Sequence, residues 1–153
     1  MRVVLDVNVL ISALLSPRGS PARLLIAWQA GEFDLIVSPT LVAELRRALA
    51  YPKLARLIPS VDAEVFVAWI SRSAVLAPDS AEPPRIRSAD PGDDYLLALA
   101  AAEHAVLVSG DTHVTALSHE FPIHTPAGFL AVLREPSSYG VRSQAPDADG
   151  TKG

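Results

Sequence analysis

Short apolar runs recur along the chain and are separated by longer segments in which apolar residues have helical spacing. The runs predicted as strands are residues 2–5, 33–37, 106–109 and 122–124, with 74–77 as a candidate for one more. The first run carries three consecutive apolar residues, which is typical of a strand in a parallel sheet covered on both faces. Because helical segments lie between the runs, the order of elements predicts an α/β sandwich around a mainly parallel sheet.

Capping residues indicate where several helices should begin. A Ser, Asp or Thr followed by proline favours a helix start, because the side chain caps the first turn and proline fits the first helical position. This pair occurs at Ser20, Ser38, Asp90 and Thr125. Asp62 is predicted to cap a helix that ends at Ser73, and Gly31 is predicted to end the second helix in a left-handed conformation.

The chain is long enough for one domain with a substantial core, and we assign that domain to residues 1–135. Residues 136–153 are polar and rich in Pro, Gly and Ser, so we expect a disordered C-terminal tail there. No apolar stretch is long enough to span a membrane, and we expect a cytoplasmic protein without a membrane partner. The absence of cysteine excludes disulfides, thiolate zinc sites and a cysteine nucleophile.

Carboxylates occur where predicted strands end or the following helices begin. Asp6 and Asp111 each follow an apolar strand, Asp94 begins the apolar helix before the strand that leads to Asp111, and Glu44 lies at the margin of the buried face of the helix after Ser38. In open α/β sheets the functional site lies at the carboxyl ends of the strands. We therefore expect these four side chains to meet at one edge of the sheet, although each could alternatively cap a helix or face solvent.

Four neighbouring carboxylates repel one another unless cations hold them or some are protonated. Oxygen ligands suit Mg²⁺ or Mn²⁺, and such a site would support metal-assisted hydrolysis of a phosphodiester. The net charge of −4 equals the charge of the four acids, so the rest of the chain is neutral. An acidic protein needs local cations to bind nucleic acid. The candidate arginines are Arg85, Arg87, Arg46, Arg47, Arg18 and Arg23.

Four segments occur in order between roughly residues 1 and 133: VVLDVNVLISALL, SPTLVAEL, DPGDDYLLALA and VLVSGDTHVTAL. Together they resemble the PIN-domain ribonucleases, and among these the VapC-like toxins of bacterial toxin–antitoxin pairs. The resemblance implies a three-layer α/β/α sandwich, Mg²⁺ or Mn²⁺ as cofactor, an RNA substrate, a homodimer and a cognate antitoxin. It places the family's acids on Asp6, Glu44, Asp94 and Asp111, with Asn8 and Ser109 as supporting residues.

The sequence departs from that family pattern at one position near the last acid. Relatives often carry a further acid two residues after it, where this chain has His113. Asp93, which adjoins Asp94, could supply negative charge in its place. His113 could alternatively be an ordinary surface histidine.

Two other functions remain open from the sequence. An aspartyl-phosphate phosphatase would use Asp6 as its nucleophile, but Asn8 stands where such enzymes need a second Asp, and Lys53 and Lys152 are the only lysines. A non-catalytic module that binds RNA or protein would use the same acids only as helix caps.

Overall fold

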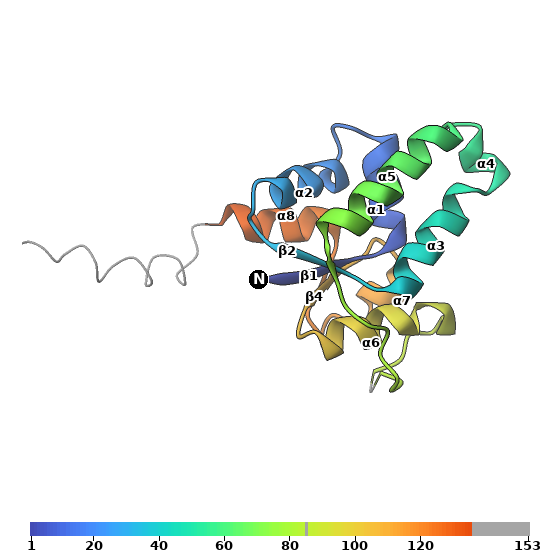
Figure 1. Ribbon diagram of the computed structural model, residues 1–153. Coiled ribbons are helices and arrows are strands. Elements are labelled where there is room, and N and C mark those ends of the chain that lie inside the picture. The colour runs from blue at the N-terminus through green and yellow to red at the C-terminus, as the bar shows by residue number, and fades with distance from the viewer. Residues whose placement is uncertain (85, 136–153) are drawn as a thin grey trace, which may run out of the picture.

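The computed structural model describes residues 1–84 and 86–135, and within them the chain forms a five-stranded sheet (Figure 1). The strands are β1 (Arg2–Leu5), β2 (Asp34–Val37), β3 (Val75–Leu76), β4 (Val106–Val108) and β5 (Ile123–His124). Their order across the sheet is β3-β2-β1-β4-β5, and every neighbouring pair is parallel. The prediction of a mainly parallel sheet is confirmed, including the candidate strand at 74–77.

Helices cover both faces of this sheet. They are α1 (Val7–Leu15), α2 (Ser20–Gln29), α3 (Pro39–Leu49), α4 (Pro52–Ala55), α5 (Ser60–Ser73), α6 (Asp94–Ala102), α7 (Thr112–Thr115) and α8 (Pro126–Arg134), with a 3₁₀ turn, η1 (Pro91–Asp93), before α6. In Figure 1, α1, α2, α5 and α8 lie above the sheet, whereas α6 lies below it and contacts β1 and β4. The three-layer α/β/α prediction is thus confirmed.

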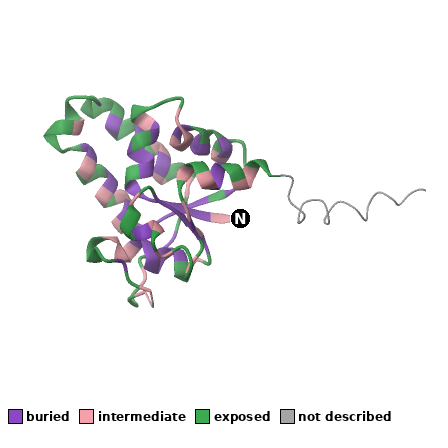
Figure 2. Cartoon of the chain, turned by 180° about the vertical axis from the view of Figure 1, so that it is seen from behind, coloured by how far each residue is buried: buried purple, intermediate pink, exposed green. Residues whose placement is uncertain are grey.

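The central strand β1 is buried from both sides, as its apolar sequence predicts. Val3, Val4 and Leu5 are completely inaccessible to solvent. Purple, buried segments run through the middle of the sheet and along the inner sides of the helices in Figure 2. None of the helices in residues 1–84 and 86–135 is long and apolar enough to cross a membrane.

Most of the predicted helix boundaries agree with the structure. The side chains of Ser38 and Thr125 accept hydrogen bonds from the first turns of α3 and α8, and Gly31 after α2 has a φ of 81°. Two caps were predicted wrongly. Gly19, not Ser20, occupies the cap position of α2. Asp62 lies inside the first turn of α5, because the carbonyl of Pro59 already accepts the amide hydrogen bond of Ala63 and starts that helix.

The predicted tail, 136–153, and Arg85 lie outside the described residues. The described residues end just after α8, at residue 135. Because the residues after it are not described, the boundary of the folded domain at residue 135 is still a prediction from composition.

Ser38→Ala is expected to lower the stability of the domain through α3. The Ser38 hydroxyl is buried and accepts the Leu41 amide at 3.2 Å, and loss of such a cap costs about 1 kcal/mol, or about 2–4 °C in Tm for a chain of this size. Thermal unfolding measures this loss. Ser20→Ala is the matched control, because Ser20 makes no capping bond; an equal loss in both variants would contradict the assignment.

Candidate functional site

Asp6 is the buried acid at the end of the central strand. Its side chain is 5% exposed, and its backbone N–H extends the pairing of β1 with β4 by donating to the Val108 carbonyl at 2.9 Å. One carboxylate oxygen, Oδ2, accepts the Ser109 hydroxyl at 2.7 Å, and the other accepts the Asn8 amide at 3.3 Å. Asp6 therefore has a fixed orientation at the carboxyl edge of the sheet.

Ser109 connects Asp6 to Asp111. The Ser109 side chain is fully buried, and its hydroxyl oxygen accepts the Asp111 amide at 3.0 Å while its hydrogen goes to Asp6. Asp111 also caps α7 by accepting the His113 amide at 2.8 Å. Capping and a role in the site are thus compatible for this residue. The structure thus places Ser109, which was predicted as a supporting residue, between these two acids.

The acidic pair at the start of α6 is divided between two environments. Asp90 caps the 3₁₀ turn by accepting the Gly92 amide at 3.0 Å, as its sequence predicts. The turn ends at Asp93 and the α-helix begins at Asp94, so the two neighbouring side chains leave the helix axis in different directions. Asp93 lines a pocket together with Asp6, Asn8 and Glu44.

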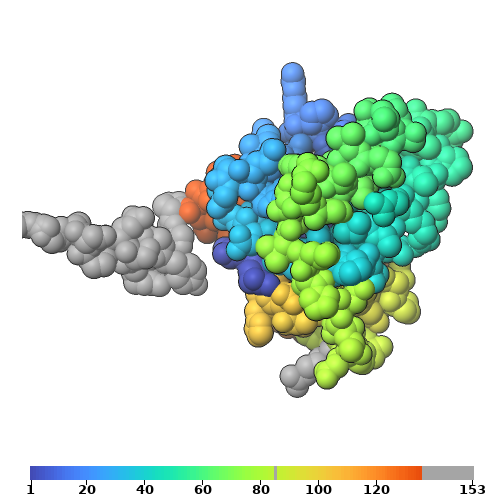
Figure 3. Space-filling model, viewed as in Figure 1, coloured from blue at the N-terminus to red at the C-terminus, as the bar shows by residue number. Residues whose placement is uncertain are grey.

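Asp94 does not line this pocket, contrary to the prediction that it meets the other acids. Its Oδ1 accepts the Ser88 amide at 3.1 Å, and its Oδ2 lies 3.7 Å from the Arg87 guanidinium. Figure 3 shows the yellow-green chain after α5 passing across the surface of the molecule toward α6. Asp94 therefore holds the end of this crossing segment through Ser88 and Arg87, while Asp93 lines the pocket.

The pocket at the carboxyl edge has a volume of about 470 Å³. The residues that line it are Asp6, Val7, Asn8, Glu44, Arg47, Ala48, Tyr51, Asp90, Gly92, Asp93 and Tyr95. We call this cavity the acidic pocket. Glu44 reaches it from α3 but forms an ion pair with Arg47 one turn later. Burial and the charges of Asp6, Glu44 and Asp93 raise the pKa of Tyr95, so its phenol stays protonated beside the acids.

Repulsion among the acids is evident at Asp93. Burial, followed by the charges of Asp6, Asp111 and Asp90, raises the pKa of Asp93 to about 6. Burial also raises the pKa of Asp6, with the charge of Asp111 as a further cause. The carboxylates of Asp6, Asp93 and Asp111 therefore form one electrostatically coupled group, which has the chemistry to attract a cation.

The donor set fits a hard divalent cation, although the ligands are not gathered around one point. Within residues 1–84 and 86–135, Asp93 Oδ2 is the one buried side-chain oxygen or nitrogen without a hydrogen-bond partner. In the same part of the chain, no group of three acidic or histidine side chains is already arranged to hold an ion. A cation would satisfy the orphaned oxygen and relieve the repulsion, and small side-chain rotations would have to bring the ligands together.

Asp93→Asn is expected to stabilise the metal-free protein at neutral and alkaline pH. In the folded protein the pKa of Asp93 is about 6, above its ordinary value of 3.8. The negative charge of Asp93 therefore lowers the stability of the fold progressively as the pH rises from 3.8 to about 6. Removing the charge should add about 1 kcal/mol near pH 8, after allowance for partial exposure, and almost nothing near pH 4. Chelator-treated protein unfolded thermally at both pH values provides the measurement. A gain that is the same at both pH values would contradict the assignment.

The arginines predicted to contact RNA lie in separate places. Arg87 faces Asp94, and Arg46 pairs with Glu64 of α5 at 3.7 Å. Arg47, by contrast, lines the acidic pocket. The structure therefore brings neither Arg46 nor Arg87 into the pocket.

His113 and Asn8 lie at the margin of the site. His113 is exposed, with Nδ1 3.3 Å from Asp111 Oδ1, so it adjoins one of the coupled acids. Asn8 is exposed and lines both the acidic pocket and a neighbouring hollow that reaches Asp111. Tyr95 and Asp90 also line the pocket but were not predicted as site residues. The signal available for them was that both lie within three residues of Asp93 in the sequence.

Comparison with known proteins agrees with this architecture. The sequence pattern of the PIN domain matches residues 2–113, which run from β1 into α7 and include every acid of the pocket. An uncharacterized protein of Methanocaldococcus jannaschii, MJ1680, is 25% identical over 122 residues, covering 78% of this chain and 77% of the relative. With its parallel five-stranded sheet and its acids at the carboxyl edge, the chain belongs to the PIN-domain family, whose fold is nuclease-like.

Proposed function

We infer that the protein is a metal-dependent endoribonuclease and that the acidic pocket is its active site. The observation that carries this proposal is Asp93 Oδ2, a buried carboxylate oxygen without a hydrogen-bond donor, in a pocket shared with Asp6. Membership of a family of nuclease-like fold supports the reaction class, and RNA as the substrate follows from the family resemblance.

The acids in and beside the pocket, and Ser109 between two of them, have distinct tasks in this proposal. Asp6, Asp93 and Asp111 would hold Mg²⁺ or Mn²⁺, with Glu44 as a further ligand after it leaves Arg47. The bound ion would lower the pKa of an attacking water and stabilise the charge that develops on the phosphate. Ser109 fixes the Asp6 carboxylate through its 2.7 Å hydrogen bond, so that one ligand is already oriented before an ion arrives.

End-labelled RNA incubated with the purified protein tests the proposed activity. We expect internal cleavage in the presence of Mg²⁺ or Mn²⁺, no cleavage with excess chelator, and recovery of cleavage when the ion is restored. A single-stranded DNA of the same sequence distinguishes a ribonuclease from a general nuclease. Cleavage that persists equally in chelator would contradict the metal-dependent mechanism.

A toxin role within a toxin–antitoxin pair, a homodimeric assembly and a cognate antitoxin are further parts of the proposal that rest on the resemblance to VapC-like toxins. Induced expression in a bacterial host should arrest growth if the protein is a toxin, and Asp93→Asn should relieve the arrest. Light scattering of the purified chain measures its oligomeric state. Normal growth with active, soluble protein would contradict the toxin role while leaving the ribonuclease proposal intact.

A non-catalytic RNA- or protein-binding module is the second candidate. The observation that favours it is the open arrangement of the acids, since no group of three in the described residues is already positioned around an ion. This alternative predicts that neither Mg²⁺ nor Mn²⁺ binds in the pocket. The metal-dependent stabilisation described in the Discussion separates the two candidates.

A further inference from the structure

Arg47 is the one cationic side chain among the described residues that line the acidic pocket. It lies on α3 one turn after Glu44, and its guanidinium donates to Glu44 Oε1. This contact raises the pKa of Arg47 further above its ordinary value. The Arg47 side chain is 63% exposed and that of Glu44 is 36% exposed, so solvent and solutes can reach the pair from outside.

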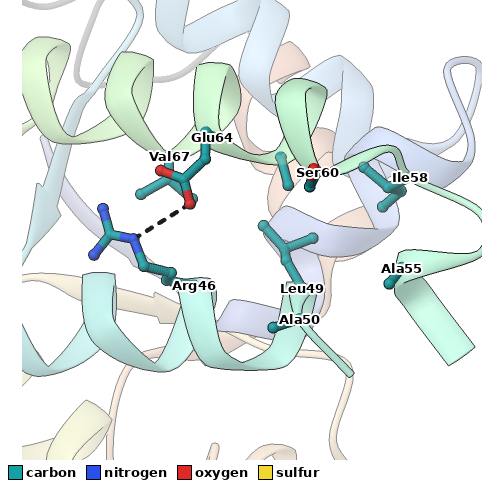
Figure 4. A pocket seen from close by; sticks show the side chains of 9 residues that line it. Arg46, Leu49, Ala50, Ala55, Ile58, Ser60, Glu64 and Val67 are labelled. Carbon is teal, nitrogen blue, oxygen red and sulfur yellow. Dashed lines mark ion pairs between the residues drawn. The ribbon is translucent and has the colours of Figure 1, made fainter. Parts of the chain in front are cut away.

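Arg46, the neighbouring residue, lies in a different environment. It faces a largely apolar groove between α3 and α5, where its Nε is 3.7 Å from Glu64 Oε2 (Figure 4). Leu49 and Val67 line that groove, and none of its lining residues belongs to the acidic pocket. Two consecutive arginines with the same charge and similar exposure therefore differ in their ion-pair partners and in the cavity that each one lines.

A polyanion that enters a pocket lined by Asp6, Glu44, Asp90 and Asp93 needs a positive group inside it. A guanidinium binds phosphate through two parallel hydrogen bonds, and it can exchange one oxyanion partner for another of similar geometry. The carboxylate of Glu44 accepts one hydrogen bond from Arg47 and thus provides the oxyanion partner that a phosphate would replace. An exposed ion pair is weak, so its exchange costs little.

We propose that Arg47 binds a backbone phosphate of the nucleic acid substrate in the acidic pocket, and that Glu44 holds the guanidinium in the free protein and gives it up to that phosphate. This inference rests on the proposed ribonuclease function and names the residue that positions its substrate. Arg47 thereby sets where the strand lies relative to Asp6 and Asp93, while the acids themselves do not attract it.

Binding of a fluorescein-labelled single-stranded RNA to the full chain tests the role of Arg47 separately from cleavage. Asp93→Asn provides a non-cleaving background, and fluorescence anisotropy in chelator measures Kd. Arg47→Gln should weaken binding about tenfold, which is the loss of one charge-assisted contact. It should also reduce the slope of log K against log salt by about 0.7, as expected for one phosphate contact on a single strand.

Arg46→Gln is the matched control, since it removes the same charge from the adjacent position. It should change Kd by less than about twofold, because exposed charges outside the pocket are screened. Arg47→Lys retains the charge but loses the two-point geometry, so it should recover only part of the affinity. Thermal unfolding verifies that each variant is folded, and both arginines are on the helix surface, where such changes are tolerated.

In the cleaving parent, Arg47→Gln should raise KM about tenfold and change kcat by less than about threefold, because the lost contact is made equally before and during the reaction. Equal effects of Arg46→Gln and Arg47→Gln on Kd, or an unchanged salt slope for Arg47→Gln, would overturn the proposal. If the parent cleaves no RNA but binding depends on Arg47, the hydrolytic function fails and the phosphate contact stands. If the parent cleaves RNA but Arg47→Gln leaves Kd unchanged, the hydrolytic function stands and the phosphate contact of Arg47 fails.

Discussion

Asp93→Asn is expected to lower the rate of RNA cleavage by a factor of about 10²–10³, whereas Asp94→Asn should change it by less than about fivefold. Asp93 faces the acidic pocket and has an orphaned, buried carboxylate oxygen. The two carboxylate oxygens of Asp94 instead contact the Ser88 amide and the Arg87 guanidinium. Asn retains the oxygen that accepts the Ser88 amide, so Asp94→Asn should remain folded with its pocket intact.

Initial rates of cleavage at saturating Mg²⁺ provide the comparison, and the pair of variants is unusually well matched. Both substitutions remove one negative charge from adjacent positions of the chain, so long-range electrostatics change almost equally. A larger loss in Asp94→Asn than in Asp93→Asn would contradict the placement of the two side chains. Equal and complete losses would indicate instead that the crossing segment fastened by Asp94 must stay ordered for activity.

Saturating Mn²⁺ is expected to raise the Tm of the parent protein by about 5–10 °C. A ligand that binds only the folded state at about one hundred times its Kd adds about 2.7 kcal/mol of stability, and each kcal/mol corresponds to about 2–4 °C for a chain of this length. The physical source is relief of the cost of burying these charges and of their mutual repulsion, which together raise the pKa values of Asp6 and Asp93. Thermal unfolding in chelator and in Mn²⁺ measures the difference.

The same unfolding experiment has an internal control. Asp93→Asn should start from a higher Tm in chelator, since it lacks the destabilising charge, and it should gain little from Mn²⁺. Asp94→Asn should respond to Mn²⁺ as the parent does. If Mn²⁺ shifts none of the three proteins, the acids act as caps and the non-catalytic alternative becomes the better account.

The fold could be predicted from the sequence because its signals are local and strong. Consecutive apolar residues at 3–5 and 106–108 mark strands buried on both faces, and both are central in the sheet. Ser38 and Asp90 mark helix starts through hydrogen bonds to amides two or three residues away. The cap predicted at Asp62 was wrong, because the Pro59 carbonyl begins the helix earlier and no capping side chain marks that start in the sequence.

The choice between Asp93 and Asp94 could not be made from the apolar pattern as it was read. Leu96, Leu97 and Ala100 are buried and lie three, four and seven residues after Asp93, so they share its side of the helix. Because α6 is apolar almost all around, this side did not stand out in the sequence. The change from the 3₁₀ turn, which ends at Asp93, to the α-helix, which begins at Asp94, adds a rotation that only the structure reveals.

The ion-pair partners of Arg46 and Arg47 could not be predicted from sequence patterns either. Arg46 and Arg47 are adjacent on α3, and both were candidates for contacts with nucleic acid. Which one meets the acidic pocket depends on the packing of α3 against α5, since Glu64 of α5 pairs with Arg46 and leaves Arg47 to Glu44. Such long-range packing has no local signal.

Direct measurement of Mn²⁺ binding tests the central claim, which is that Asp6, Asp93 and Asp111 together hold a divalent cation at the carboxyl edge of the sheet. The electron paramagnetic resonance signal of free Mn²⁺ decreases when the ion binds, so a titration of the parent, Asp93→Asn and Asp94→Asn gives the affinity of each. We expect the parent and Asp94→Asn to bind Mn²⁺ alike and Asp93→Asn to bind it at least about tenfold more weakly. Binding lost in Asp94→Asn but retained in Asp93→Asn, or absent from all three, would contradict the claim.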